Sequence, residues 1–242
     1  MTQHLLQNRT EKEVVWFQRR DTLKAAAAWV AMGGLPAAVA QQRSNIVELT
    51  GDVLLNGARL LPEQTLQTGD QIQTGPASTL VFVLGNASFR VRQNSMMAVE
   101  RGATLSIVSL LRIITGGVVS VWGKGNNGGN RAIVTPTLTA GIRGTGVYTE
   151  VLPLQNSRTY FCNCYGTVDL DAGGSKAQSQ SDYHQSFWAD ADEKNGSRLS
   201  PAKFLDHTDE ELEFLARLIN QQTYWQKAGR KGTPDGKGSM GY

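Results

Sequence analysis

The sequence has few of the residues that cross-link chains or bind metals. Its 242 residues contain only 2 Cys and 3 His, which excludes a disulfide-stapled scaffold and a histidine-rich metal cage. No apolar run approaches the ~20 residues that span a bilayer, which excludes a polytopic membrane protein. The formal net charge is only +3. What the chain does have is 26 glycines and a hydrophobic fraction of 40%, enough to build a core.

The first forty residues have the parts of a secretory signal. A polar stretch ends in the pair Arg19-Arg20, and Thr-Leu-Lys follows at positions 22–24. A short run of small apolar residues over 25–35 comes next, and its Gly-Gly pair makes it a poor spanning helix. The arginine pair and the weakly hydrophobic run are typical of a twin-arginine signal, which exports proteins that have already folded. We therefore predict a twin-arginine-type signal peptide over residues 1–40.

The end of this segment predicts where the signal is removed. Ala38-Val39-Ala40 is a small-residue cleavage site, so we expect the mature chain to begin at Gln41. The removed segment holds five basic and three acidic residues, which leaves 19 basic and 18 acidic residues. A net charge of +1 gives no electrostatic reason to expect a nucleic-acid partner. We predict a periplasmic or otherwise exported protein with no transmembrane span after signal removal.

Residues 46–170 consist of short β-rich runs separated by Gly, Asn and Asp. Asn56-Gly57 is a strong signal for a tight hairpin. In the run 88–92, Phe and Val alternate with Arg, so this strand should have one buried and one solvated face. The β-branched run 106–114 and the run 118–122 are predicted as two further strands. Many short strands with regular turns predict an all-β sandwich, barrel or solenoid.

Several of these motifs occur in the order found in a known family. The chain resembles the FecR domain, the periplasmic signal-receiving module of bacterial iron-siderophore regulators. The resemblance covers roughly residues 46–170. Its most specific motif is the string TPTLTAGIRGTGVY at 135–148. The weaker motifs are Gly51-Asp52-Val53, the segment 69–75, the strand pair around Leu80 and Phe89, and Gly116-Gly117-Val118.

The resemblance implies a twisted solenoid-like or sandwich-like β domain over residues 41–170. It also implies a role in sensing or protein interaction rather than catalysis. Regulators of that family carry a cytoplasmic anti-sigma segment and a membrane helix before the domain. Because only eighteen residues precede Arg19, we do not expect this chain to regulate a sigma factor directly.

Within the longest motif, Arg143, Gly144 and Thr145 have two interpretations. They could form a functional site. Alternatively, the glycines could allow an unusual backbone geometry while Arg143 pairs with a carboxylate or carbonyl group. We favour the structural interpretation, because glycines that bracket a strand usually mark bends.

Cys162 and Cys164 are the strongest candidates for chemistry. On a strand, residues two apart point the same way, so both thiols should share one face. With His184 and His207 they could form a Cys2His2 site for zinc or iron, although the C-x-C spacing is tighter than usual. Alternatively, the two cysteines are small core residues in an apolar strand face, or they form a strained disulfide. The sequence leaves these three possibilities open.

The sequence after residue 170 indicates no further catalytic or binding site. Residues 171–205 are polar and are predicted as a loop region. Thr208 and Glu211 form a capping box, so we predict one amphipathic helix within 206–227 that packs on the β domain. Residues 228–242 are rich in Gly, Lys and Ser and are predicted to be disordered.

The sequence contains no nucleophile elbow, zinc-protease motif, Walker loop or dinucleotide fingerprint. The C-x-C-Y-G segment at 162–166 and the His-Thr-Asp-Glu-Glu-Leu segment at 207–212 resemble segments of exported FecR-like proteins. We therefore predict a non-enzymatic, exported FecR-like protein that senses a signal or binds a protein partner in the envelope. The competing hypothesis is a metal-binding or redox-active exported protein that uses the C-x-C pair.

Overall fold

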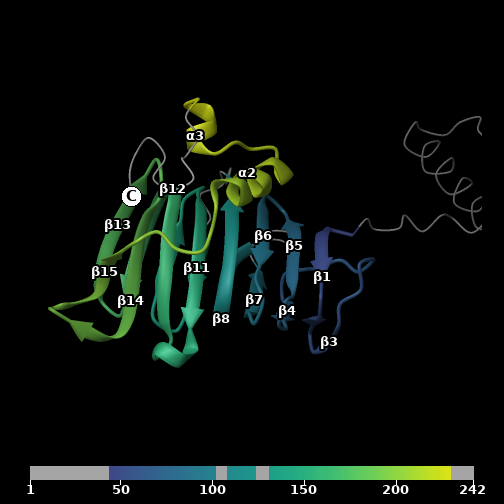
Figure 1. Ribbon diagram of the computed structural model, residues 1–242, viewed down its shortest axis with the longest axis horizontal. Coiled ribbons are helices and arrows are strands. Elements are labelled where there is room, and N and C mark those ends of the chain that lie inside the picture. The colour runs from purple at the N-terminus through teal and green to yellow at the C-terminus, as the bar shows by residue number, and fades with distance from the viewer. Residues whose placement is uncertain (1–43, 102–107, 124–130, 230–242) are drawn as a thin grey trace, which may run out of the picture. The chain divides into compact units, whose positions relative to one another are not determined.

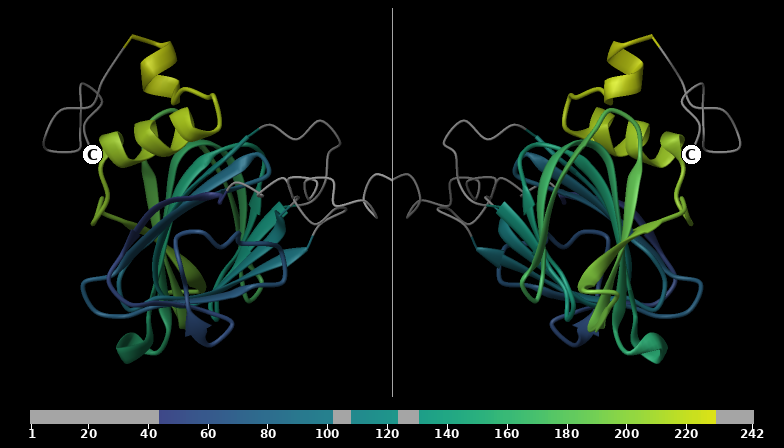
Figure 2. Two further views of the ribbon diagram at one scale, coloured as in Figure 1. Left: turned by 90° about the vertical axis from the view of Figure 1, so that its right-hand side faces the viewer. Right: turned by 90° about the vertical axis from the view of Figure 1, so that its left-hand side faces the viewer.

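The structure of the chain, a computed structural model, describes residues 44–101, 108–123 and 131–229 (Figure 1). Four predicted signal residues lie outside this part of the chain: Arg19, Arg20, Ala38 and Ala40. Most of the predicted tail, from residue 230 on, also lies outside it. Among the described residues, 15 strands form one branched sheet folded into two facing layers, which confirms the predicted all-β fold (Figure 2). None of the helices in this part is long and apolar enough to cross a membrane.

The two layers, called A and B here, are antiparallel except where β8 and β9 pair in parallel. Layer A contains, in spatial order, β1 (Ile46–Thr50), β5 (Thr79–Leu84), β6 (Ala87–Val91), β8 (Val108–Trp122), β11 (Gly146–Leu152), β12 (Arg158–Ala172), β14 (Gln185–Lys194) and β15 (Ser197–Ala202). Layer B contains β3 (Ala58–Arg59), β2 (Val53–Leu55), β4 (Gln71–Thr74), β7 (Met96–Arg101), β8, β9 (Arg131–Val134), β10 (Thr139–Ile142), β12 and β13 (Ser175–Ser181).

Two long strands, β8 and β12, belong to both layers and pass from one to the other at a glycine. β8 pairs with β7 and β9 before Gly116, and with β6 and β11 from Gly116 on. β12 changes partners in the same way at Gly166. Their φ angles are +74° and +101°, and an added Cβ at Gly166 would lie 2.7 Å from Thr145 Cγ2. Because only glycine adopts such a backbone without strain, these two positions determine where the sheet folds over.

The main hydrophobic core lies between the layers and is formed by the inward face of each strand. Phe82 stacks on Phe89 with ring centroids 4.9 Å apart, and Phe89 meets the edge of Trp122 at 5.3 Å. All three side chains are fully buried. Burial of one large apolar side chain stabilises the fold by about 1.5–3 kcal/mol, so this face of the strands holds the layers together.

Two helices, α2 (Asp209–Leu218) and α3 (Tyr224–Lys227), follow the strands, and α2 packs on β6 and β8 of layer A. The predicted capping box is confirmed: the side chain of Thr208 accepts from the N–H of Glu211, and the Glu211 carboxylate accepts from the N–H of Thr208. The predicted C-terminal amphipathic helix is confirmed as α2, but it ends at Leu218 rather than continuing to 227. The chain turns at Asn220, whose φ is +55°, and a second capping box starts α3.

The outer face of β6 is partly covered by α2, where a solvated face was predicted. The alternation in β6 is present, but Arg90 and Arg92 lie beneath α2 and pair with Glu211. Arg92 donates twice to that carboxylate, at 2.7 and 3.0 Å. A second hydrophobic core fills the space between the outer face of layer A and the helices, and its buried members include Val81, Val119, Val121, Tyr148, Tyr160, Cys162, Cys164, Leu212 and Leu215.

The predicted polar loop over residues 171–205 is wrong, because this segment forms β13, β14 and β15. Its Ser, Gln and Lys residues give little hydrophobic pattern, yet β13 pairs along its whole length with the second half of β12. The single strand β8 contains residues 108–114 and the run 118–122, which were predicted as parts of two separate strands. In both places pairing with neighbouring strands decides the structure, rather than local propensity.

Candidate metal centre

Cys162 and Cys164 lie in the first half of β12, and their side chains share the outer face of layer A, as their spacing predicts. Phe161, between Tyr160 and Cys162, points the other way into the main core. Both thiols are 0% exposed and free. Their Sγ atoms are 3.8 Å apart, well beyond a disulfide bond length of about 2.05 Å. The cysteines are therefore buried and not joined in a disulfide. Because both sulfurs lie on the same face, they can bind the same ligand.

His184 and His207 reach the thiols from two other segments of the chain. His184 lies in the turn between β13 and β14, where its φ is +39° and its N–H donates to the carbonyl oxygen of Cys164 at 2.9 Å. His207 lies between β15 and the cap of α2. Both imidazoles are buried. The fold thus brings together all four residues that the sequence suggested as metal ligands.

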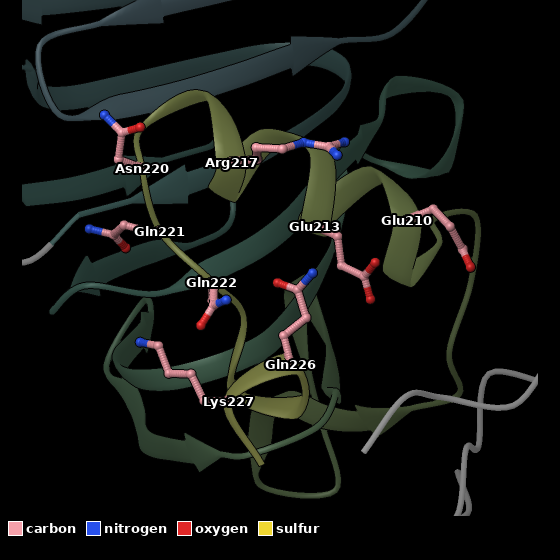
Figure 3. Close-up of a pocket in the computed structure, with 8 residues that line it drawn as sticks. All are labelled: Glu210, Glu213, Arg217, Asn220, Gln221, Gln222, Gln226 and Lys227. Carbon is pink, nitrogen blue, oxygen red and sulfur yellow. The ribbon is translucent and has the colours of Figure 1, made fainter. Parts of the chain in front are cut away.

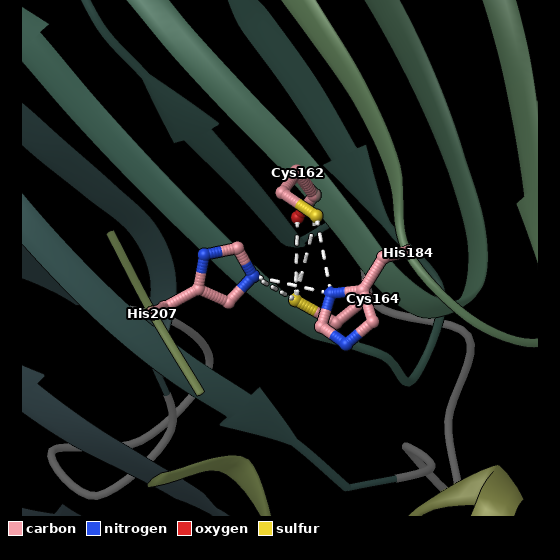
Figure 4. A group of neighbouring side chains, drawn as sticks. All are labelled: Cys162, Cys164, His184 and His207. Carbon is pink, nitrogen blue, oxygen red and sulfur yellow. Dashed lines mark hydrogen bonds between the residues drawn. The ribbon is translucent and has the colours of Figure 1, made fainter. Parts of the chain in front are cut away.

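The four side chains converge on one point (Figure 4). Cys162 Sγ lies 3.5 Å from His184 Nδ1, and Cys164 Sγ lies 3.3 Å from His207 Nε2. The two imidazole nitrogens are 3.2 Å apart. A tetrahedral zinc ion with ordinary bond lengths would place its sulfurs about 3.8 Å apart, a sulfur and a nitrogen about 3.6 Å apart, and its nitrogens about 3.3 Å apart. The observed separations match the edges of such a tetrahedron closely.

The remaining ligand pairs need only small movements. All four ligand atoms lie within 4.8 Å of one another. Side-chain shifts on the order of 1 Å would bring every pair to the separation that a tetrahedral ion requires. The group is therefore almost preformed for one ion.

Groups behind the imidazoles fix which nitrogen of each ring faces the thiols. His184 Nε2 lies 3.0 Å from a carboxylate oxygen of Asp209, and His207 Nδ1 lies 2.7 Å from the carbonyl oxygen of Leu205. Both oxygens only accept hydrogen bonds, so these nitrogens carry the ring protons. Tyr183 donates its hydroxyl to the other oxygen of Asp209 at 2.8 Å. Carboxylate–histidine pairs of this kind orient the histidine ligands of metal sites.

Asp209 and Tyr183 are residues of the candidate site that the sequence did not reveal. In the sequence, Asp209 is explained as the first residue of the acidic first turn of a helix capped by Thr208. No further sequence pattern indicated that it also contacts His184. Asp209 is 25 positions from His184 in the chain. Only the docking of α2 on layer A brings the two together.

Aromatic side chains enclose the cluster. Tyr148 and Phe204 lie against His207, with ring centroids at 4.9 and 4.4 Å. Trp225 of α3 stacks on His184 at 5.4 Å with an interplanar angle of 22°. Four protein ligands in a buried apolar shell are typical of structural metal sites, whereas catalytic sites keep one position open to water or substrate.

Burial and mutual contacts affect the two thiols differently. Burial, together with the neighbouring Cys162, raises the pKa of the Cys164 thiol well above its usual value. Burial also opposes ionisation of Cys162. There, the hydrogen bond from Cys164, the positive charge of a protonated His207 and hydrogen bonds from the two imidazoles outweigh burial and hold the pKa of Cys162 well below its usual value. The site therefore favours one thiolate, the form in which cysteine binds metals.

The same contacts could also describe a thiol nucleophile oriented by His184 and Asp209. However, Cys162 is 0% exposed, so no substrate atom can reach its sulfur in this state. A nucleophile also has no need of the second thiol and the second imidazole. The arrangement therefore fits a metal ion better than a nucleophilic site.

The motif Arg143-Gly144-Thr145 lies apart from the four ligands and next to the bend of β12. Arg143 donates to Asp169 through Nε at 2.9 Å, in an exposed ion pair. Gly144 has a φ of +82°, and Thr145 is buried, with its carbonyl oxygen accepting from the N–H of Trp122. These contacts agree with the structural interpretation, in which the three residues stabilise a bend of the chain.

A polar cavity of about 860 Å³ lies between α2 and α3 (Figure 3). Its lining includes Glu213 and Arg217 of α2 together with Gln226 and Lys227 of α3. Glu213 also accepts from the indole N–H of Trp225 at 2.9 Å, the side chain that stacks on His184. All residues that line the cavity thus lie in α2, α3 and the turn between them.

The chain matches none of the protein-family models and none of the curated proteins with which it was compared. It is similar to two crystal structures of candidate anti-sigma factors from Parabacteroides distasonis. The first is 12% identical with a TM-score of 0.46 and covers 57% of this chain and 60% of that one. The second is 9% identical with a TM-score of 0.44 and covers 60% and 64%. The chain spans about three fifths of these structures, and a likeness this distant carries no argument about function.

Proposed function

We propose that this chain is an exported, non-enzymatic protein that receives a signal or binds a protein partner outside the cytoplasm. We further propose that one zinc or iron ion holds its C-terminal part in place. The observation that carries the metal is the convergence of the ligand atoms of Cys162, Cys164, His184 and His207 within 4.8 Å. Two buried imidazoles that face two buried thiols exceed what core packing requires, because buried polar groups cost free energy.

The ligand set suits a single divalent ion. Two sulfur and two nitrogen ligands in a tetrahedron are typical of zinc, and ferrous iron accepts the same donors. A divalent ion with two thiolates is neutral, so a dry site can hold it without a net charge. In a two-iron cluster with mixed ligands, the thiolates and imidazoles bind different irons. Here each thiol contacts an imidazole directly, which favours one ion.

The sensing or interaction role is supported by the FecR-like motifs, above all the string at 135–148. Export is supported by the signal-like segment 1–40. If the twin-arginine route is used, the chain folds and takes up its ion before export. A variant in which Arg19 and Arg20 are both Lys should then stay in the cytoplasm. Export of that variant at the normal level would contradict this route.

Metal content tests the proposal directly. Full-length protein purified without chelator should contain about one equivalent of zinc or iron by elemental analysis and native mass spectrometry. Replacing Cys162 and Cys164 by Ser should remove it. Val119→Ala is a matched control, because it also truncates a buried side chain of the second core and should keep the ion. Wild-type protein without stoichiometric metal, from cells supplied with both ions, would overturn the metal part of the proposal.

A further inference from the structure

Residues 203–229, called the C-terminal cover here, lie on the outer face of layer A without joining its sheet. Backbone hydrogen bonds at its turns and caps join residues of the cover to one another, for example Gln221 N–H to the Ala216 carbonyl oxygen and Ala228 N–H to the Tyr224 carbonyl oxygen. Side chains supply polar attachments between the cover and the sheet. The Ser88 hydroxyl donates to the carbonyl oxygen of Leu215 at 2.8 Å, and Leu205 N–H donates to the Tyr160 hydroxyl at 3.0 Å. Such a segment can separate from the sheet without breaking any strand ladder.

The four ligands are divided between the sheet and the cover. Cys162 and Cys164 belong to β12, and His184 belongs to the turn before β14. His207 belongs to the cover. Asp209, also in the cover, contacts His184 from the other side at 3.0 Å. An ion at this point would join the cover to the sheet through His207. It would also strengthen the contact between His184 and Asp209.

The cover protects apolar surface that a free sheet would expose. Beneath it, Val119, Val121, Tyr148 and Tyr160 of layer A are at most 1% exposed. The cover contributes Leu212 and Leu215 to the same cluster. The apolar contact alone favours the closed form, and the ion would add to it only in that form.

We propose that the metal ion is a clasp that closes the C-terminal cover on layer A, and that loss of the ion releases the cover while the two-layer fold stays intact. This inference rests on the proposed metal site. Binding of a divalent ion M²⁺ forms two metal–sulfur and two metal–nitrogen bonds and releases two protons, one from the remaining thiol and one from the imidazolium that pairs with the thiolate: M²⁺ + Cys–S⁻ + Cys–SH + His–H⁺ + His → M(Cys–S)₂(His)₂ + 2 H⁺. No electron is transferred, so a chelator reverses the reaction.

The strength of the clasp follows from mass action. If the ion binds only the closed form, it lowers the opening constant of the cover by the factor 1 + [M]/Kd. At a free-ion concentration of 100 Kd, the amides of α2 should therefore exchange about 100-fold more slowly than in the apo protein. Amides of β2 and β4 in layer B are the internal reference, because these strands pair with each other, β3 and β7 and not with β12.

Hydrogen exchange of the full chain, measured by mass spectrometry with Zn²⁺ and again after chelation, tests the clasp. We expect chelation to speed exchange in residues 209–218 and to leave β2 and β4 unchanged. His207→Ala should show the fast exchange even with Zn²⁺. Ser88→Ala, which removes an attachment of the cover but no ligand, should still respond to the ion.

The outcomes separate the two proposals. Zn²⁺ that does not bind would overturn both the metal site and the clasp. Zn²⁺ that binds in the wild type without changing exchange in α2 would overturn the clasp alone. Equal acceleration in α2, β2 and β4 on chelation would also overturn it, because the ion would then stabilise the whole fold rather than the cover.

Discussion

His184 Nδ1 and His207 Nε2 face each other at 3.2 Å, and the other nitrogen of each ring donates its proton to an oxygen. The lone pairs of two ring nitrogens at this distance repel each other unless a proton or another positive group lies between the nitrogens and their neighbours. Each does have a thiol beside it, at 3.5 and 3.3 Å. One divalent ion in place of the two protons that these four groups share satisfies all four atoms at once. This relationship is the physical basis of the proposed metal site.

Asp209→Asn should weaken metal binding without abolishing it. The amide can still accept from His184, but it lacks the charge that makes the imidazole a stronger ligand. Loss of such a second partner typically lowers metal affinity about 10–100-fold. Competition titration with a chromophoric chelator would measure the change. Glu210→Gln removes the same charge one position later in α2 and is the matched control; equal weakening by both variants would contradict a specific role for Asp209.

Gly166→Ala should destabilise the fold, because an added methyl group meets Thr145 at 2.7 Å and the φ of +101° strains any other residue. We expect a loss of at least about 1–3 kcal/mol in the free energy of unfolding, measured by urea denaturation. Gly141→Ala is the control in the neighbouring strand β10, where the nearest atom would lie 3.7 Å away. That variant should change stability by no more than about 0.5 kcal/mol. Similar losses in both variants would show that the bend at Gly166 has no special requirement for glycine.

Arg143→Ala should raise the pKa of Asp169. Hydrogen bonds from Gln178 and then from Arg143 hold the pKa of this carboxyl below its usual value. A depressed pKa in the folded state contributes stability above the usual range of Asp, and this contribution is lost as the pH falls through the folded-state value. An NMR titration of the carboxyl would show the rise. Lys176→Ala, which removes the nearby ion pair with Asp171, should leave the pKa of Asp169 unchanged.

Local turn and capping signals predicted their parts of the fold well. The hairpin at Asn56-Gly57 joins β2 to β3, with φ angles of +53° and +82°, as its type of turn requires. The strands after residue 171 were missed, because their Ser, Gln and Lys side chains carry no hydrophobic period. Ser179, for example, is buried by pairing with β12 rather than by its own hydrophobicity.

The sequence predicted the four candidate ligand residues, but it did not predict Asp209, which contacts one of them. The C-x-C spacing placed both thiols on one face, and the scarcity of histidine pointed to His184 and His207. The contact of Asp209 with His184 depends on how α2 docks, and no local pattern encodes the docking of a helix. Sequence alone therefore could not choose between core packing and metal binding.

Titration of apo protein with Co²⁺ tests the central claim most directly, because the visible absorption of Co²⁺ reports both its geometry and its sulfur ligands. We predict intense tetrahedral bands and a sulfur-to-metal charge-transfer band that both saturate at one equivalent per chain. The bands should be displaced by Zn²⁺ and absent when Cys162 and Cys164 are replaced by Ser. Weak octahedral absorption without saturation, the same in the wild type and the double variant, would contradict the site.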